Sequence, residues 1–316
     1  MAAGTVLSTG FESPFTLGPL ENQLGWLTAG SGASSATVQN SVVHTGSQAL
    51  LVTRTANSDR RWAVPNLQGL PTQRFVAVDW DMRVAGPAGN PEAEEFGPFF
   101  GVEAYDDDNP DKLIRVLGSL GVDATTGDVL YQIQDSGELT ESGRTVAFNQ
   151  WYHFKLVLDF LNDTYVGFVN GMMVADTGFV DRGFNLDDFT DADIAAFAAG
   201  FDPVSQTLSS SAAFDNFIIR DGIPGDYDAD GDVDNADYVR WRSEFGTTET
   251  PGHGSDGNSD GSVDAADYVV WRINRGLSLF PTSGLGSAVV PEPASLVMGL
   301  LAALLASIGA RSRHRS

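Results

Sequence analysis

The sequence predicts a mainly β protein whose body is an antiparallel sandwich. Residues 75–84 (FVAVDWDMRV) place an apolar side chain at every even position, and residues 152–160 (YHFKLVLDF) do the same from position 154 onward. A period of two is typical of strands with one buried face. Asn170-Gly171 separates two further apolar runs, and both residues tolerate the positive φ that a tight hairpin requires.

The other elements follow from the same pattern. One helix is predicted at 191–199 (DADIAAFAA), with Thr190 as its N-cap. Many strands with short turns and few helices favour a sandwich. The sandwich domain is assigned to residues 1–221, a second unit to 222–276 and a linker to 277–290. Further strands are predicted at 48–54, 99–105, 113–120, 129–134 and 212–220.

The composition limits the classes of partner. The chain has 42 Asp and Glu against 18 Lys and Arg, which gives a net charge of −24. Such a surface repels a phosphate backbone and attracts cations, so we expect no nucleic-acid partner. The sequence contains no cysteine, which excludes disulfides, thiolate catalysis and cysteine-ligated zinc.

An acidic stretch occurs twice, 30 positions apart. The segments DYDADGDVDNADYVRWR at 226–242 and DGNSDGSVDAADYVVWR at 256–272 share a glycine at position 6, a valine at position 8, the Tyr-Val and Trp-Arg pairs of the following helix and most of their acidic positions. A solvated acidic linker has no reason to repeat its apolar positions in register. The repeat therefore favours two structured loops whose aspartates are neutralised by bound cations.

The spacing fits a 12-residue calcium loop, with oxygen ligands at positions 1, 3, 5, 7, 9 and 12 and glycine at position 6. Position 12 opens a predicted helix in each repeat, at 237–245 and 267–275. Val233 and Val263, at position 8, are expected to contact each other, and two Ca²⁺ ions are expected to bind. The predicted ligands are Asp226, Asp228, Asp230, the Asp232 carbonyl, Asp234 and Asp237 in loop one, and Asp256, Asn258, Asp260, the Ser262 carbonyl, Asp264 and Asp267 in loop two.

Two loop–helix units with Asp at position 12 resemble a type I dockerin module over residues 226–276. The resemblance implies calcium binding and docking of the helices onto a cohesin. Cohesin recognition in that family depends on a Ser-Thr-like pair at loop positions 10 and 11, where this chain has Asn235-Ala236 and Ala265-Ala266. Calcium binding is unaffected by this departure, whereas the cohesin partner is left open. The helix aromatics are expected to form the module's core: Tyr238, Trp241, Tyr268 and Trp271.

Three features follow in order at the C-terminal end. The motif Pro291-Glu292-Pro293 precedes an uncharged apolar run at 294–310, and an arginine-rich tail ends the chain. As a helix the run would span roughly 25 Å, the short end of a transmembrane segment, with its basic flank in the cytoplasm. This order resembles the PEP-CTERM sorting signal, which implies recognition by an exosortase for residues 291–316. An ordinary tail anchor and a buried helix are the alternatives.

We therefore expect an exported protein of the cell envelope or extracellular space, transiently anchored by its C-terminal helix. Export needs a leader, and residues 1–15 contain neither a basic segment nor an apolar one. The leader is expected to precede residue 1 in the precursor.

Residues 11–221 resemble a concanavalin A-like (laminin G-like) jelly-roll sandwich. That family includes lectins, glycosidases and structural modules, so the fold alone does not give the function. The segments that carry the resemblance are GFESPF at 10–15, VAVDWDMRV at 76–84, WYHFKLVLDFLNDTYVGFVNGMMVAD at 151–176 and AAFDNFIIRDG at 212–222.

The sequence offers little support for catalysis. A retaining glycosidase needs two carboxylates about 5–5.5 Å apart, and the laminarinase-type motif Glu-x-Asp-x-x-Glu is absent. Asp79 and Asp81, and the acidic run at 92–95, are interpreted as solvated charges. The segment YDDDN at 105–109 predicts an acidic hairpin turn rather than a further calcium site.

These observations predict a non-enzymatic exported protein, with a sandwich that binds carbohydrate or matrix and a calcium-binding interaction module. An extracellular polysaccharide is the expected ligand. Trp26 and Trp62 are weak candidates for stacking on a sugar, whereas Trp80 is expected in the core. Two alternatives are a glycoside hydrolase that degrades polysaccharide and a purely structural surface protein.

Overall fold

The computed structural model describes residues 4–65, 67, 74–86, 95–107, 114–184, 186–249, 253–258 and 260–280. The described residues all belong to one compact unit, Met1–Pro281. The predicted sorting motif and apolar run lie outside the described residues. Within the described residues, no helix is both long and apolar enough to cross a membrane.

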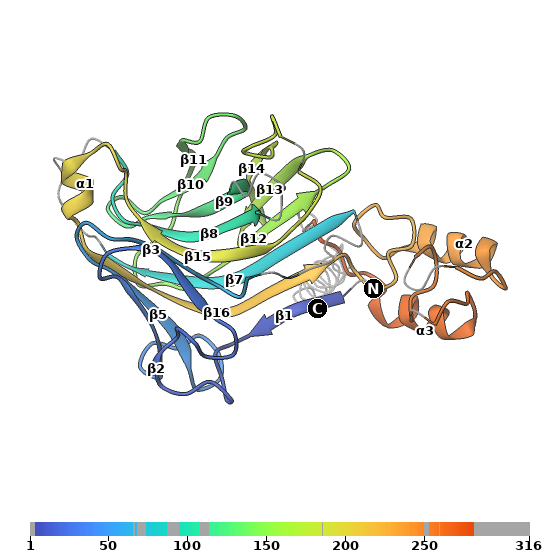
Figure 1. Cartoon of the computed structure of the whole chain (residues 1–316). Helices are drawn as coiled ribbons and strands as arrows, with labels where there is room; N and C mark the ends of the chain where they lie inside the picture. The colour runs from blue at the N-terminus through green and yellow to red at the C-terminus, as the bar shows by residue number, and fades with distance from the viewer. Residues whose placement is uncertain are drawn as a thin grey trace, which may run out of the picture. The chain divides into compact units, whose positions relative to one another are not determined.

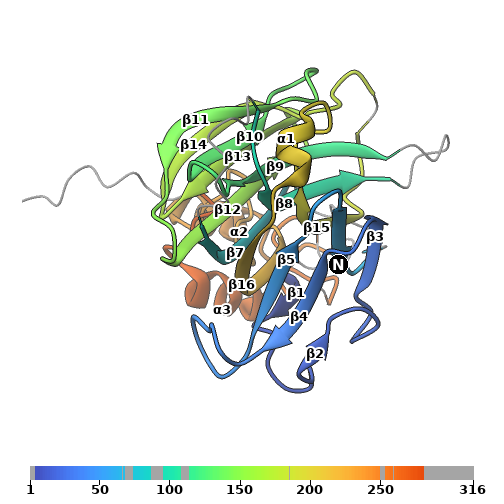
Figure 2. The same cartoon turned by 90° about the vertical axis from the view of Figure 1, so that its left-hand side faces the viewer.

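The body is an antiparallel sandwich of two sheets (Figures 1 and 2). Strand β1 (Gly4–Thr9) pairs with β16 at one side of the first sheet. The main path of that sheet runs in the order β14 (Met172–Gly178), β13 (Thr164–Val169), β12 (Tyr152–Asp159), β7 (Phe75–Ala85), β16 (Ser210–Asp221), β5 (Ala49–Arg54), β4 (Ser35–Gln39) and β2 (Gly18–Pro19).

The second sheet carries the candidate site described below. A short helix, α1 (Pro203–Thr207), lies between β15 and β16 in the chain. The strands of this sheet run in the order β11 (Leu139–Thr145), β10 (Asp128–Gln132), β9 (Arg115–Asp123), β8 (Phe99–Asp106), β15 (Asp191–Phe197), β6 (Asp59–Ala63) and β3 (Leu27–Ser31).

The core lies between the facing sides of the two sheets, and it confirms the alternation seen in the sequence. The even positions of β7 and β12, such as Val78 and Leu156, are buried in one hydrophobic cluster. Ala192, Ile194 and Ala196 of β15 enter the same cluster from the second sheet. The hairpin at Asn170-Gly171 is also present between β13 and β14, and both turn residues have positive φ.

The helix predicted at 191–199 is wrong, because residues Asp191–Phe197 form strand β15. This strand pairs with β8 on one side and β6 on the other, so tertiary pairing overrides the helical propensity of alanine. The sequence also satisfies a period of two here. Its even positions enter the core, whereas Asp191 and Asp193 lie on the opposite face of the sheet.

Other side chains were also misplaced by the sequence interpretation. Trp26 and Trp62 are core residues, only 1% and 2% exposed, so they are not surface platforms for a sugar. Asp79 and Asp81 are 5% and 6% exposed, so they are buried rather than solvated. Trp80, in contrast, is fully buried as predicted. Of the acidic run at 92–95, the described residues include Glu95 alone.

Residues 222–280, the helical module, contain α2 (Asn235–Glu244) and α3 (Ala265–Asn274). Both helices begin with a capping box, in which the Asp at position 9 of the loop and the Asp at position 12 satisfy each other's backbone N–H groups. The chain leaves α2 through Gly246 at φ +88°, the left-handed conformation that glycine adopts most easily.

The two repeats of the module are interlocked. Trp241 Nε1 donates to the Asp264 carbonyl at 2.9 Å, and Trp271 Nε1 donates to the Asp234 carbonyl at 2.7 Å. The Trp271 ring packs against Tyr238 of the first repeat, and the Trp241 ring packs against Tyr268 of the second. These contacts agree with the core role expected of the helix aromatics.

The valines at position 8 connect the two repeats through their backbones. Val233 and Val263 are both buried, and each pairs its backbone with the segment that follows the helix of the other repeat. The Val233 N–H donates to the Leu277 carbonyl at 2.9 Å, and the Val263 N–H donates to the Thr247 carbonyl at 3.0 Å.

Candidate functional site

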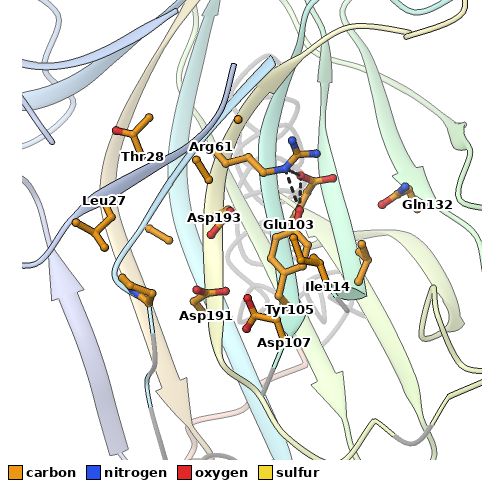
Figure 3. Close-up of a pocket in the computed structure, with 15 residues that line it drawn as sticks. Leu27, Thr28, Arg61, Glu103, Tyr105, Asp107, Ile114, Gln132, Asp191 and Asp193 are labelled. Atoms are coloured by element: carbon orange, nitrogen blue, oxygen red, sulfur yellow. Dashed lines mark hydrogen bonds and ion pairs between the residues drawn. The ribbon is translucent and has the colours of Figure 1, made fainter. Parts of the chain in front are cut away.

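A pocket of about 650 Å³ opens on the outer face of the second sheet (Figure 3). Strands β3, β6, β8, β9, β10 and β15 all contribute to it. Its polar lining is mainly acidic, with Glu103, Asp107, Asp191 and Asp193 against the guanidinium of Arg61. The remaining lining residues are Leu27, Thr28, Ala29, Gly30, Ala63, Pro65, Tyr105, Ile114, Val116 and Gln132.

Strand register places two carboxylates directly opposite each other in this pocket. Asp193 of β15 is paired with Glu103 of β8, and Asp191 is paired with Tyr105 two positions along. Directly opposed residues of an antiparallel pair have Cβ atoms about 4.5–5.5 Å apart. Figure 3 shows Asp191 and Asp193 on the strand adjacent to Glu103 and Tyr105.

Glu103 is held by two donors that converge on one oxygen. Arg61 Nε donates to Glu103 Oε2 at 2.6 Å, and Tyr105 Oη donates to the same oxygen at 2.8 Å. Arg61 Nε also donates to Tyr105 Oη at 2.9 Å, and its guanidinium lies 4.9 Å from the centroid of the Phe197 ring. Because Glu103 is only 2% exposed, this network fixes its orientation.

Asp193 has a strongly raised pKa. Burial, together with the negative charges of Asp191 and Glu103, raises the pKa of Asp193 to about 8. Burial and the charge of Asp107 raise the pKa of Asp191 to about 7. At neutral pH the pocket therefore pairs a protonated Asp193 with Glu103, whose Oε2 accepts two hydrogen bonds.

This arrangement can donate a proton and present a nucleophilic oxygen to the same bond. Two carboxyl groups in different environments are the usual machinery of glycosidic-bond cleavage. Within the described residues, the carboxylates of the pocket do not converge as a set of metal ligands.

Sequence analysis missed this site for a specific reason. The segment at 191–199 was interpreted as a helix, so Asp191 and Asp193 were not placed on a strand face. Glu103 lies within the predicted strand 99–105, but its partner Asp193 is 90 residues away in the chain. The alternation D-x-D before alternating alanines was the signal that could have placed both aspartates on one face.

A second cluster lies on the outer face of the first sheet. His153 Nδ1 contacts Asp81 Oδ1 at 2.9 Å, and its Nε2 lies 3.3 Å from Asp79 Oδ1. The hydrogen bonds with Asp79 and Asp81 raise the pKa of His153 to about 9. Arg220 and Lys155 also pair with Asp79, so these buried carboxylates are compensated by cations. We interpret the cluster as structural.

The structure brings the predicted ligands of loop one (226–237) together. Carboxylate oxygens of Asp226, Asp228 and Asp237 lie within 4.8 Å of one another, and so do those of Asp232, Asp234 and Asp237. Asp237 is fully buried and accepts from the backbone N–H groups of Tyr227 (2.7 Å) and Asp228 (3.1 Å).

Loop two (256–267) repeats the same hydrogen-bond pattern. Asp267 accepts from the backbone N–H groups of Asn258 at 3.1 Å and Asp264 at 2.7 Å. Asp256 accepts from Gly261 at 2.8 Å, as Asp226 accepts from Gly231 at 3.0 Å in loop one. Ser262 donates its N–H to Asp260 at 2.9 Å, which shapes the turn that directs its carbonyl. Asp230 likewise accepts from Asp232 in loop one at 3.1 Å.

The electrostatics of loop one fit a cation. Among the described residues, Asp228 Oδ1 and Asp232 Oδ1 are buried oxygens with no hydrogen-bond partner. Burial and the charges of neighbouring aspartates raise the pKa of Asp226 to about 7 and that of Asp228 to about 6. Buried oxygens that lack donors and repel one another are what a hard divalent cation would satisfy.

Comparisons with known proteins give structural neighbours only. No protein family and no curated protein matches the sequence. Cellulose induced protein, Cip1, is 14% identical with a TM-score of 0.47, and the match covers 68% of this chain and 97% of that chain. The endo-beta-1,4-glucuronan lyase from the fungus Trichoderma reesei is 10% identical with a TM-score of 0.46, over 65% of this chain and 94% of that chain. Alginate lyase Aly36B is 15% identical with a TM-score of 0.42, over 67% and 95%.

One prediction is corrected at this point. The matched structures include two named lyases and also sialidases, which contradicts the prediction of a non-enzymatic protein. That prediction is wrong. Identities of 10–15% transfer no residue's role, so the chemistry below is argued from the pocket itself.

Proposed function

We propose that the protein is a carbohydrate-active enzyme that hydrolyses glycosidic bonds in the pocket on the second sheet. The observation that carries the proposal is the cross-strand pair of Asp193 and Glu103, two buried carboxyl groups in unlike environments. Directly opposed strand residues have Cβ atoms about 4.5–5.5 Å apart, so both carboxyl groups can face one bound sugar unit. We assign the reaction to the retaining class, in which the two carboxyl groups flank the scissile bond, as part of this proposal. A polysaccharide is accordingly the proposed partner of the sandwich domain.

The residues divide the reaction between them. Asp193 gives its proton to the glycosidic oxygen as the bond to the anomeric carbon breaks, and a carboxylate oxygen of Glu103 bonds to that carbon. Water then enters, the Asp193 carboxylate takes one of its protons, and the water oxygen displaces Glu103. Arg61 and Tyr105 hold Glu103 Oε2 throughout, so they are positioning residues for the nucleophile.

Elimination, the reaction of a lyase, fits the pocket less well. Such a site needs a base for the sugar-ring proton and a cation to neutralise the uronate carboxylate. Burial and the charge of Glu103 raise the pKa of Tyr105 well above its ordinary value, so a phenolate base is disfavoured. The guanidinium of Arg61 is already neutralised by Glu103. Hydrolysis is therefore the favoured reaction.

The charge of the pocket favours an uncharged glycan. Its described lining contains four carboxyl groups and one guanidinium, in a chain of net charge −24. A uronate polymer would be repelled by this lining, whereas a neutral hexose or pentose polymer would not.

Activity assays on the full chain test the reaction and the substrate class together. We expect new reducing ends from neutral glucans or xylans, with no ultraviolet-absorbing unsaturated product. E103Q and D193N are expected to lower kcat by about 100-fold or more, the usual contribution of a general acid or nucleophile. Release of unsaturated uronates, or full activity in both variants, would contradict the proposal.

For the helical module we propose binding of two Ca²⁺ ions, with dockerin-like docking as its purpose. The support is the converging carboxylates of loop one, the matching backbone hydrogen bonds of loop two, and the buried oxygens of Asp228 and Asp232 that lack donors. Calcium would supply the neutralising charge, while Asp237 and Asp267 would link each ion to a helix start. The proposed partner of the helices is a cohesin-like protein, although Asn235-Ala236 and Ala265-Ala266 replace the recognition pair of the dockerin family.

Calorimetric titration of the full chain with Ca²⁺ tests the module. We expect two sites per chain and a gain of helical circular dichroism. One site or none, or an unchanged spectrum, would refute the calcium assignment.

We also propose export to the cell envelope or extracellular space, with sorting by an exosortase at Pro291-Glu292-Pro293. The support is the order of motif, apolar run and arginines in the sequence. Mass spectrometry of the protein from its native cells tests this: cleavage near residue 293 is expected, and an intact C-terminus in mature protein would overturn the proposal.

A further inference from the structure

We propose that calcium loop one is a joint that couples calcium occupancy to the stability of the sandwich, whereas loop two, which contacts loop one where Tyr227 Oη donates to the Asp267 carbonyl at 2.7 Å, contributes much less. The inference rests on the calcium binding proposed above. It assigns an intramolecular binding surface to the outer face of the first sheet, near the start of β7 and the end of β12.

An apolar cluster joins loop one to that surface. Phe75 and Ala77 of β7, Val157 of β12 and Phe168 of β13 pack in one cluster with residues of the module. Loop one supplies two of its members, Tyr227 at position 2 and Val233 at position 8. The cluster contains no residue of 256–267, the span of loop two, among the residues that the structure describes.

The backbone of loop one also positions the segment that follows α3. The Leu279 N–H donates to the Gly231 carbonyl at 2.9 Å, and Asp232 forms a β-bridge with Ser278. This segment places Phe280 against Phe75, with ring centroids 5.4 Å apart in an edge-on arrangement. Ordering of loop one by an ion therefore orders an aromatic contact with the sandwich.

Arg74 adds a polar clamp to the same contact. Its guanidinium makes a two-point interaction with Asp159 at the end of β12, at 2.8 and 2.6 Å. Arg74 Nη1 also donates to the carbonyl of Ala229, at 3.2 Å. Ala229 has φ +58°, a conformation that costs free energy for a residue with a Cβ. Arg74 thus links the sandwich to a strained position within loop one.

Because of these contacts, an ion bound in loop one should stabilise the sandwich more than an ion bound in loop two. An ion that binds only the ordered form of loop one stabilises everything whose packing requires that form. Loop two orders the segment after α2, through the pairing of Val263 with Thr247. That segment is not part of the cluster on the sandwich.

Hydrogen exchange of the full chain, followed by mass spectrometry with and without Ca²⁺, tests the joint. Saturating Ca²⁺ should slow exchange of the amides at 75–77 and 155–159 by about tenfold or more. The repeat provides a matched pair of variants at loop position 1. D226N should abolish this slowing, whereas D256N should leave most of it.

A second pair of variants separates the clamp from the ion. R74Q should retain two calcium sites but lose most of the slowing in the sandwich. R83Q is its control, because Arg83 lies in β7, which Arg74 immediately precedes, and donates to the Asn149 carbonyl instead. Calcium binding without slowing at 75–77, or equal effects of D226N and D256N, would overturn the joint alone. Absence of calcium binding to the unmodified chain would overturn both the joint and the calcium assignment.

Discussion

Single residues carry the proposed chemistry, and Asp193 shows the conflict between chemistry and stability most clearly. A carboxyl group that must stay protonated at neutral pH has to be buried beside other negative charge. Asp193 meets this condition because Asp191 lies two residues away on the same strand and Glu103 lies opposite. The neighbours that keep Asp193 protonated also destabilise the fold when Asp193 ionises.

The raised pKa of Asp193 predicts that D193N stabilises the protein at alkaline pH. The folded-state pKa of about 8 exceeds the unfolded value of about 3.9, so protonated Asp193 favours folding at low pH. That stability is lost as the pH rises through 8. Asparagine cannot ionise, so we expect a melting temperature at least about 2 °C above that of the parent at pH 9. Thermal unfolding at pH 5 and pH 9 measures this, with D163N as an exposed control. A lower melting temperature at pH 9 would contradict the stated pKa.

His153 predicts a pH dependence of the same sign from another part of the molecule. Its pKa is raised to about 9 by hydrogen bonds with Asp79 and Asp81, above an unfolded value of about 6.5. The imidazolium therefore stabilises the fold below pH 6.5, and this contribution is lost as the pH rises to 9. H153N should lower the melting temperature at pH 6 and have little effect at pH 10. The matched control is H253N; equal losses at both pH values would exclude a charge effect.

Among the helices and strands, those determined by local sequence could be predicted, whereas those determined by pairing with distant strands could not. The strands at 75–85 and 152–159 could be predicted because their alternation is local. The helices after both loops could be predicted because caps, glycine stops and aromatic spacing lie within a few residues. Strand β15 could not, because alanine favours helix and only pairing with β8 and β6 decides otherwise. The pairing of Asp193 with Glu103 depends on that same register, so the site was missed together with the strand.

The aspartate that caps each module helix is also a proposed calcium ligand, so removal of the ion should weaken the helix. Asp237 accepts the Asp234 N–H at 2.7 Å as part of the α2 capping box and also converges with Asp226 and Asp228. One side chain therefore connects the helix start to the proposed ion. Chelation should lower the helical circular dichroism of the chain, and D237N should reduce the part that Ca²⁺ restores by about half, because one of two helices loses its ion. A chelator-insensitive spectrum would contradict this coupling.

Across the whole molecule, charge bears on the class of the proposed substrate. The net charge of −24 and the acidic pocket act in the same direction on an anionic oligosaccharide. Asp193 and His153 also lose their stabilising protonated states over overlapping alkaline ranges. The intact protein is therefore expected to work best on uncharged glycans at neutral or mildly acidic pH, where Asp193 still holds its proton.

Ionic strength separates this electrostatic selection from selection by shape. The Debye length, the distance over which exposed charges interact, is about 30 Å at 0.01 M salt but only about 3 Å at 1 M. In the D193N background, which removes the proton donor but leaves the Arg61–Glu103 ion pair in place, binding of a neutral oligosaccharide at neutral pH should be independent of salt, whereas binding of a uronate oligomer should be weak and strengthen as salt is added. Calorimetry at both salt concentrations measures this. D107N removes one exposed charge from the pocket lining, so it should strengthen binding of the uronate alone. Tight uronate binding at low salt would instead identify the pocket as a site for acidic polysaccharides, because repulsion by the ionised carboxylates of the pocket would then have been overcome by specific contacts.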